Sequence, residues 1–262
     1  MSLSSNTFSS SVAVIGGSGF YRLSESSTSK PFVHEIKTPY GSESVRLYGE
    51  QIGTKSVWFI PRHGQEHAIA PHKINYRANL WALKKVGVKQ IVAVNAVGGI
   101  TQTMSPGSLC LPDQILDYSW GREHTYFDGS DTLDESFFDN HIDFSWPYNK
   151  SLGLMLAQAA QDLGIKLSNS GTYACMQGPR LETAAEVRKL KNDGADIVGM
   201  TGMPEAALAR ELGIDYSCVA LVVNWGAGLT ESVISLEEIK QVLADGVDDI
   251  RRILLKALSN IT

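Results

Sequence analysis

The sequence predicts an α/β fold with a mostly parallel, partly mixed sheet flanked by helices. Two observations carry this prediction. Short apolar, β-branched runs recur along the chain, at residues 12–15, 56–60, 91–97, 172–176, 196–200 and 216–223. Stretches with helical spacing lie between several of these runs. Strands that are apolar throughout and alternate with helices imply a sheet that is covered on both faces.

The predicted helices end at glycines. The stretches 74–87, 151–164 and 204–213 stop at Gly87, Gly164 and Gly213, where a C′ glycine would terminate a helix. The tail opens at Ser235 with Ser-Leu-Glu-Glu, a serine cap followed by acids in the first turn. It then runs amphipathically to about Leu258, so we expect a long C-terminal helix.

Composition limits the classes of protein. The 262 residues, 43% of them hydrophobic, suffice to bury a core without disulfides or metals. A net charge of -5 and the lack of a basic block argue against a nucleic-acid partner. Cys110, Cys175 and Cys218 are odd in number, widely spaced and free of CxxC pairing, which favours a reducing cytoplasm over a disulfide or zinc framework.

The N-terminal residues 1–11 contain neither a basic region nor an apolar core. They are predicted to be a disordered or added leader, not a signal peptide or anchor, ahead of a single domain over residues 12–262. No uncharged apolar run approaches the roughly 18 residues of a spanning helix. We therefore expect a soluble, cytoplasmic protein with no membrane partner.

Small, hydroxylic, cationic and amide residues follow the apolar runs. Ligands of such sheets bind beyond the carboxyl ends of the strands, so these residues are the candidate site. Turn formation alone explains any one of them, but together, and almost without acids, they predict an anion site. They are Gly16-Gly17-Ser18-Gly19, Pro61-Arg62-His63-Gly64, Asn95-Ala96-Val97-Gly98-Gly99, Gln177-Gly178-Pro179-Arg180, Met200-Thr201-Gly202 and Asn224.

The first of these segments is not a dinucleotide fingerprint, because GxGxxG would need a glycine at Arg22. Its backbone N–H groups and the Ser18 hydroxyl can still cradle one phosphate. Arg62 and His63 supply a fixed cation and a second donor, suited to a planar fork on phosphate oxygens. The structural alternative is a surface arginine and a core histidine.

Several other motifs can be explained by structure alone. His63 and His67 are four residues apart, but nearby prolines and a glycine make a continuous helix doubtful, so we expect no metal. Glu182 is predicted at the start of a helix, where the helix dipole favours a carboxylate. Met200 and Thr201 fit a core methionine and a turn threonine. No nucleophilic triad emerges around Ser18, which lies outside a GxSxG elbow.

The motifs IGGSG, RHG, HKINYRANLWALK, NAVGG, GPRLETAAE, GMTGMPEAALARELG and VVN occur in one order over residues 12–258. In this they resemble the trimeric purine nucleoside phosphorylase and 5′-methylthioadenosine phosphorylase family. The resemblance implies a mixed, partly barrel-like sheet and phosphorolysis, in which inorganic phosphate attacks the anomeric carbon of a purine nucleoside. It implies a homotrimer, with a hexamer left open. It implies no cofactor, since phosphate is a co-substrate.

The resemblance also assigns roles to single residues, with Asn224, Glu182 and His63 as the catalytic groups. Met200 would lie against the ribose, Leu181 takes the place of a base-stacking Phe in many relatives, and Gly226 replaces a second base-side acid of the methylthioadenosine enzymes. The phosphate contacts would be Ser18, Arg62, His63, Asn95, Ala96 and Thr201.

The amide at position 224 predicts the base. A 6-oxopurine offers an acceptor at C6 and an N1–H donor, whereas a 6-aminopurine offers a donor at C6 and bare acceptors at N1 and N7. The NH₂ group of Asn224 can donate to O6 or N7, and Glu182 can accept from N1–H. Mispairing would leave a buried polar group unsatisfied, at a cost of about 1–3 kcal/mol. We therefore predict a preference for hypoxanthine-type nucleosides.

The resemblance places Leu236 where inosine-cleaving relatives carry a histidine for the 5′-hydroxyl. Leucine cannot donate but can pack on a thioether methyl, and His141 of a neighbouring subunit would reach the same pocket. The predicted substrate is a 6-oxopurine 5′-methylthionucleoside. The alternatives are an inosine/guanosine phosphorylase, a methylthioadenosine phosphorylase, a phosphate-independent nucleosidase and a non-catalytic nucleoside-binding protein.

Overall fold

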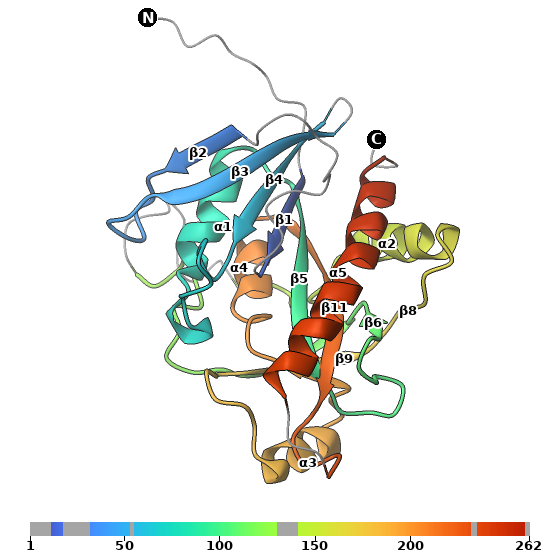
Figure 1. Ribbon diagram of the computed structural model, residues 1–262. Helices are drawn as coiled ribbons and strands as arrows, with labels where there is room; N and C mark the ends of the chain where they lie inside the picture. The colour runs from blue at the N-terminus through green and yellow to red at the C-terminus, as the bar shows by residue number, and fades with distance from the viewer. Residues whose placement is uncertain (1–11, 18–31, 53–54, 130–140, 232–234, 260–262) are drawn as a thin grey trace, which may run out of the picture.

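A computed structural model describes residues 12–17, 32–52, 55–129, 141–231 and 235–259. It confirms the α/β prediction: an 11-stranded mixed sheet runs through the molecule with helices on both faces (Figure 1). Six of the ten strand pairings among the described residues are parallel. The sheet formed by the described strands branches but does not close into a barrel, in contrast to the partly barrel-like sheet that the resemblance implied.

The bounds of the elements are as follows. The strands are β1 (Val12–Gly16), β2 (Phe32–Ile36), β3 (Val45–Ile52), β4 (Lys55–Pro61), β5 (Gln90–Gly99), β6 (Leu109–Cys110), β7 (Gln114–Tyr118), β8 (Leu167–Ser168), β9 (Thr172–Met176), β10 (Ile197–Gly199) and β11 (Asp215–Trp225). The helices are the 3₁₀ turn η1 (Pro71–Lys73), α1 (Tyr76–Lys85), α2 (Lys150–Asp162), α3 (Ala184–Asn192), α4 (Glu205–Glu211) and α5 (Leu236–Ser259).

Strand β5 is the branch point of the sheet. The main path runs β2-β3-β4-β1-β5-β10-β9-β7. Strand β11 branches from this path by pairing with β5 along its whole length; β6 pairs with β11, and β8 pairs with β6. Strands β1 and β5 pair in parallel only as far as Ile15 and Ala93. Beyond that point β5 turns toward β10, which it meets at Gly98 and Gly99. The strands therefore splay apart at their carboxyl ends, where an α/β sheet can accommodate a ligand.

All six apolar runs form strands, and the three predicted terminating glycines have left-handed backbone, with φ of 85° at Gly87, 68° at Gly164 and 64° at Gly213. The long C-terminal helix is also confirmed as α5. The sequence did not indicate β2 and β3, which form an antiparallel hairpin at one edge of the sheet. Strand β2 is largely exposed, so it lacks the kind of apolar run that marked the six predicted strands.

The two faces of the sheet have separate cores. Alternate residues of β5 point to opposite faces: Ile91 and Ala93 belong to the core under α1 and α4, and Val92 and Val94 to the core under α2 and α5. A third, smaller cluster packs beneath α3 around Val187 and Leu190. Figure 1 shows α5 lying along β11 and α3 at the far end of the molecule.

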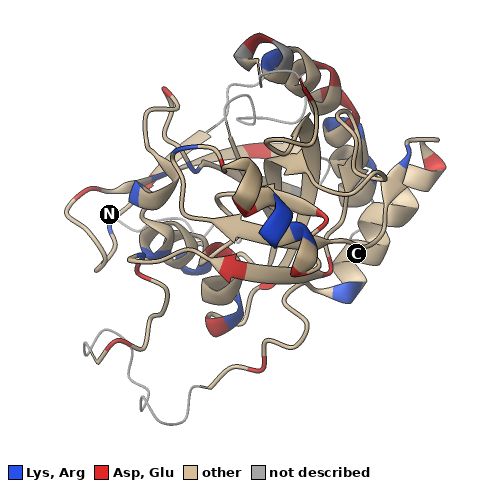
Figure 2. Cartoon of the chain, turned by 90° about the horizontal axis from the view of Figure 1, so that it is seen from below, with Lys and Arg blue, Asp and Glu red and all other residues tan. Residues whose placement is uncertain are grey.

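The surface is consistent with the charge balance of the sequence. Figure 2 shows basic and acidic segments interspersed over the helices, with further charged segments on some of the strands. Cys110, Cys175 and Cys218 are all buried as free thiols. Among the described residues, no helix is long and apolar enough to cross a membrane.

Candidate active site

A cavity of about 320 Å³ lies at the splayed carboxyl ends of β1, β4, β5 and β11. This volume lies in the usual range for small-molecule sites, roughly 300–1,000 Å³. Most of the predicted site residues meet there. Its lining includes Gly17, Arg62, His63, Asn95, Ala96, Leu181, Glu182, Met200, Thr201, Asn224 and Gly226. We call the part around Arg62, His63, Asn95 and Thr201 the Arg62 side, and the part around Glu182, Asn224 and Gly226 the α3 side.

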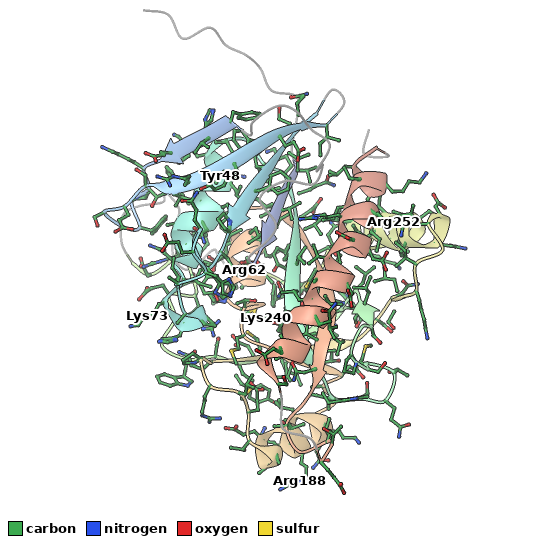
Figure 3. All side chains as sticks on the ribbon, viewed as in Figure 1. Tyr48, Arg62, Lys73, Arg188, Lys240 and Arg252 are labelled. Carbon is green, nitrogen blue, oxygen red and sulfur yellow. The ribbon has the colours of Figure 1, made fainter. Side chains whose placement is uncertain are left out.

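Arg62 fills the opening between β1 and β5. Its backbone N–H continues the ladder beyond β4 by donating to Gly16 O at 3.0 Å. Its guanidinium donates from Nη1 to Val94 O at 2.9 Å and from Nη2 to Ile15 O at 3.3 Å, carbonyls of the two diverging strands. Figure 3 shows Arg62 inside the molecule, whereas Lys73, Arg188 and Arg252 lie at its periphery.

The carboxylate of Glu205 at the start of α4 pairs with Arg62. It accepts from Nε at 3.0 Å and from Nη2 at 2.7 Å, and both side chains are buried, 2% and 0% exposed. Tyr216 donates to Glu205 Oε1 at 2.8 Å. Burial alone would lower the pKa of Arg62, but the Glu205 carboxylate raises it, so the guanidinium stays charged.

The sequence-based expectation of a fork on phosphate therefore differs from the geometry. The Nε–Nη2 edge of Arg62 holds Glu205, and the two carbonyls take one N–H each. Of the five guanidinium N–H groups, one on Nη1 is left for a ligand. Neither Glu205 nor Tyr216 was identified from the sequence, because they are far from Arg62 along the chain.

His63 adjoins Arg62 on the cavity wall. Its Nδ1 lies 2.8 Å from Ile69 O, and a carbonyl can only accept, so Nδ1 carries the hydrogen. Burial, with a smaller contribution from the charge of Arg62, lowers the pKa of His63 to about 4, so the ring is neutral at pH 7. The ring of His67 lies 4.5 Å from that of His63 between centroids.

Tyr173, a residue that the sequence did not single out, underlies the other groups of the Arg62 side. Its hydroxyl accepts from Asn95 Nδ2 at 3.5 Å and from the backbone N–H of Thr201 at 3.4 Å. A Cβ at Gly199 would overlap this hydroxyl, and one at Gly202 would press on the ring. Glycines on both sides of Met200 and Thr201 therefore let this loop close over the tyrosine.

A β-bulge presents Asn224 to the cavity. The register of β11 against β5 shifts between Val222 and Asn224, so Val223 and Asn224 both line the cavity. The amide Nδ2 donates to Trp225 O at 2.7 Å, which leaves one N–H and the Oδ1 acceptor for a ligand. Gly226 is held by its N–H bond to Gly99 O at 2.8 Å, and a Cβ there would crowd Val187 and that carbonyl.

Glu182 lies on the α3 side but not in the first turn of the helix. Thr183 is the N-cap of α3 and Glu186 completes a capping box with it, so Glu182 precedes the cap. The expectation of a dipole-stabilised carboxylate thus fits Glu186 and is wrong for Glu182. Burial raises the pKa of Glu182 above its ordinary value. Its neighbour Leu181 also lines the cavity and is 46% exposed.

The remaining wall of the cavity is apolar. Ile239 and Leu243 of α5 line it together with Val223 and Ala227, and the sequence did not identify any of these four. Leu236, the predicted 5′ contact, is the first residue of α5, although its side chain lies outside the described residues. Residues 236, 239 and 243 recur at helical spacing, which puts them on one face of the helix.

Two other predicted residues are not among the cavity residues. Ser18 falls outside the described part of the chain, directly after Gly17. His141 is exposed and does not line the cavity of its own chain. Within the described ranges, no group of three His, Cys, Asp or Glu side chains is arranged to hold a metal ion.

The cavity thus combines a buried cation, a neutral histidine and a threonine on one side with an amide and a carboxylate on the other. A family-wide comparison matches residues 11–259 to the phosphorylase superfamily. The chain belongs to that superfamily. The match spans nearly the whole chain and confirms the resemblance inferred from the motifs.

Individual proteins similar to this chain are also phosphorylases. The chain is 47% identical over 247 residues to a probable S-methyl-5′-thioinosine phosphorylase of Pseudomonas syringae, covering 94% of this chain and 98% of the relative. It is 41% identical over 247 residues to the 6-oxopurine nucleoside phosphorylase of Pyrococcus furiosus, covering 94% and 91%. A methylthioadenosine phosphorylase from Schistosoma mansoni in complex with adenine superposes with a TM-score of 0.88 at 32% identity, covering 95% and 91%.

Proposed function

We propose that the protein catalyses phosphorolysis of S-methyl-5′-thioinosine, converting it with inorganic phosphate to hypoxanthine and 5-methylthioribose 1-phosphate. The bond between C1′ and N9 breaks, the base leaves with the electron pair, and a phosphate oxygen bonds to C1′. No cofactor takes part. The reaction would serve purine salvage in the cytoplasm.

The observation that carries the base assignment is the amide of Asn224 on the cavity wall. With one N–H held by Trp225 O, Asn224 keeps one N–H that can donate to O6 or N7 of the base. Glu182 lines the same cavity and accepts from N1–H. The bond that Asn224 donates strengthens as negative charge develops on the departing base, so it favours the transition state over bound substrate.

The apolar wall of the cavity favours a substrate with a 5′-methylthio group. Ile239 and Leu243 present aliphatic side chains to the cavity, and Leu236 begins the same helix at matching spacing. A thioether methyl gains from burial against such a wall, by roughly 1 kcal/mol. A 5′-hydroxyl would lose its hydrogen bonds to water there without replacement.

The Arg62 side would hold phosphate. The remaining Nη1–H of Arg62, the Thr201 hydroxyl, His63, Asn95 and Ala96 surround the anion, with Ser18 at the adjacent loop. Met200 would lie against the ribose and Leu181 against the base. Bond breaking leads, so the pentose becomes cationic between the base and the phosphate, which acts as nucleophile and as electrostatic partner.

The proposal includes assembly as a homotrimer, with a hexamer as the larger alternative. His141 of a neighbouring subunit would then close the 5′ end of the sugar pocket. Its exposure on its own chain leaves it accessible for such a contact.

A substrate panel tests the proposed function. Initial rates with S-methyl-5′-thioinosine, methylthioadenosine and inosine are measured with and without phosphate. We expect phosphate-dependent release of hypoxanthine, with methylthioinosine preferred. Tenfold preference for methylthioadenosine would refute the base assignment, preference for inosine would refute the 5′ assignment, and equal release without phosphate would indicate a nucleosidase.

A second candidate is an inosine/guanosine phosphorylase. It keeps Asn224 and Glu182 in the same roles, and relatives named 6-oxopurine nucleoside phosphorylases are 38–43% identical to the chain. The apolar face of α5 is the observation against it. The inosine arm of the substrate panel distinguishes the two.

A further inference from the structure

The Arg62 side brings little net charge to an anion. Among the described residues that line the cavity, Arg62 carries the fixed positive charge. The carboxylate of Glu205 already neutralises this charge through two hydrogen bonds. His63 adds no charge at neutral pH. An anion is therefore recognised here mainly by its pattern of hydrogen-bond donors and acceptors rather than by excess positive charge.

The tautomer of His63 fixes one position in that pattern. Nδ1 lies 2.8 Å from Ile69 O, and because a carbonyl oxygen only accepts, Nδ1 must carry the ring hydrogen. In the neutral ring, Nε2 then carries a lone pair and is an acceptor. Because Nδ1 is engaged with the backbone of the turn, Nε2 is the ring nitrogen left to meet a ligand in the cavity that His63 lines.

We propose that His63 Nε2 accepts a hydrogen bond from the P–OH group of hydrogen phosphate and thereby makes the site selective for oxyanions that carry a hydrogen. Phosphate near neutral pH offers one P–OH group to this lone pair. Sulfate has the same shape and charge as the phosphate dianion but has no hydrogen to donate. A sulfate oxygen would face the lone pair directly and leave Nε2 unpaired. Sites built to pair a substrate hydroxyl discriminate against analogues that lack it for this reason.

This inference rests on the proposed phosphate-dependent reaction and refines it. It also changes the role expected for His63 from the sequence, which was a second donor beside Arg62. The two roles make opposite predictions for sulfate, because a donor would serve phosphate and sulfate alike.

The test measures the KM for phosphate and the competitive Ki for sulfate on the full chain. In the wild type we expect the sulfate Ki to exceed the phosphate KM by about tenfold or more, the usual effect of an unpaired buried acceptor. His63→Ala removes the acceptor, so the phosphate KM should rise about tenfold while the sulfate Ki stays unchanged or falls. Both constants are independent of the fraction of folded enzyme.

A second variant makes the test sharper. His63→Gln places a carboxamide that can donate as well as accept, so sulfate should inhibit it more strongly than the wild type. His34→Ala removes an exposed histidine on β2, which does not line the cavity, and should change neither constant.

Each result has one meaning. A wild-type sulfate Ki equal to the phosphate KM, a parallel loss of both ions in His63→Ala, or no gain of sulfate inhibition in His63→Gln overturns the inference while the phosphorylase function stands. Release of hypoxanthine that does not depend on phosphate overturns the proposed function itself, and the inference with it.

Discussion

The two sides of the cavity hold their polar groups in different ways. On the Arg62 side, Arg62 is fixed by Glu205 from another element, and Tyr173 connects the Asn95 and Thr201 segments. On the α3 side, Asn224 bonds to the carbonyl of the next residue. The groups proposed to bind the anion are thus part of the core, whereas the groups proposed to read the base are attached to their own local backbone. We infer that base preference can change by substitution at little cost to the fold, and that the anion site cannot.

The largest expected effect is on stability, in Glu205→Gln. It leaves the buried Arg62 without its charge partner, which typically costs about 3–5 kcal/mol of unfolding free energy. Glu35→Gln breaks the ion pair with Arg46, whose two side chains are both exposed, and should cost far less, because water screens such a pair. Urea denaturation of both variants measures the difference. Equal losses would mean that the Arg62 side is no more integrated into the core than the surface.

Asn224→Asp should change specificity with little effect on folding. The new carboxylate accepts from a 6-amino group but cannot donate to O6, so the ratio of kcat/KM for methylthioinosine to that for methylthioadenosine should fall by about 10–100-fold. Asn192→Asp adds the same charge at the exposed end of α3 and should leave the ratio unchanged. An unaltered ratio in Asn224→Asp would remove Asn224 from base recognition.

Glu182 should impose a pH dependence. Because burial raises its pKa, Glu182 loses its charge at a higher pH than an ordinary glutamate as the solution is acidified. The rate with methylthioinosine should therefore decline on the acid side, and Glu182→Gln should lower the rate by about tenfold and remove that decline.

Glu186→Gln is the matched control for this pH dependence. Hydrogen bonds from Arg180 and from the backbone of Thr183 lower the pKa of Glu186 to about 2, and Glu186 does not line the cavity. This variant should therefore keep the acid-side decline. The same decline in Glu182→Gln as in the wild type would show that another group titrates.

The smallest effect is expected for Tyr173→Phe. Its two hydrogen bonds to the Arg62 side are long, at 3.4 and 3.5 Å, so losing the hydroxyl should cost about 1 kcal/mol or less and raise the phosphate KM a few-fold. Tyr126→Phe removes a hydroxyl that bonds to Arg77 O away from the cavity and should not affect this KM. A KM unchanged in both variants would mean that Tyr173 does not position the Thr201 segment.

Much of this arrangement could be predicted from the sequence. Apolar runs marked six strands, and the residues that follow them, such as Arg62, Asn95, Thr201 and Asn224, do line one cavity, because parallel strands bring their carboxyl ends together. Left-handed backbone at Gly87 reflects the same local code for a helix end.

The rest depends on contacts that local patterns do not encode. Glu205 lies 143 residues from Arg62 along the chain, and its place in an amphipathic helix looks ordinary until the fold buries it. The tautomer of His63 follows from a carbonyl at Ile69, which only the turn geometry reveals. Ile239 packs against the core beneath α5, as its spacing suggests, but it also forms part of the cavity wall, which the spacing does not reveal.

The central claim is that Asn224 and Glu182 select a 6-oxopurine. The most direct test is the ratio of kcat/KM for S-methyl-5′-thioinosine to that for methylthioadenosine in the wild type at saturating phosphate. One mispaired buried polar group predicts a ratio of about ten or more in favour of the oxo nucleoside. A ratio of one, or a preference for the amino nucleoside, would contradict the account.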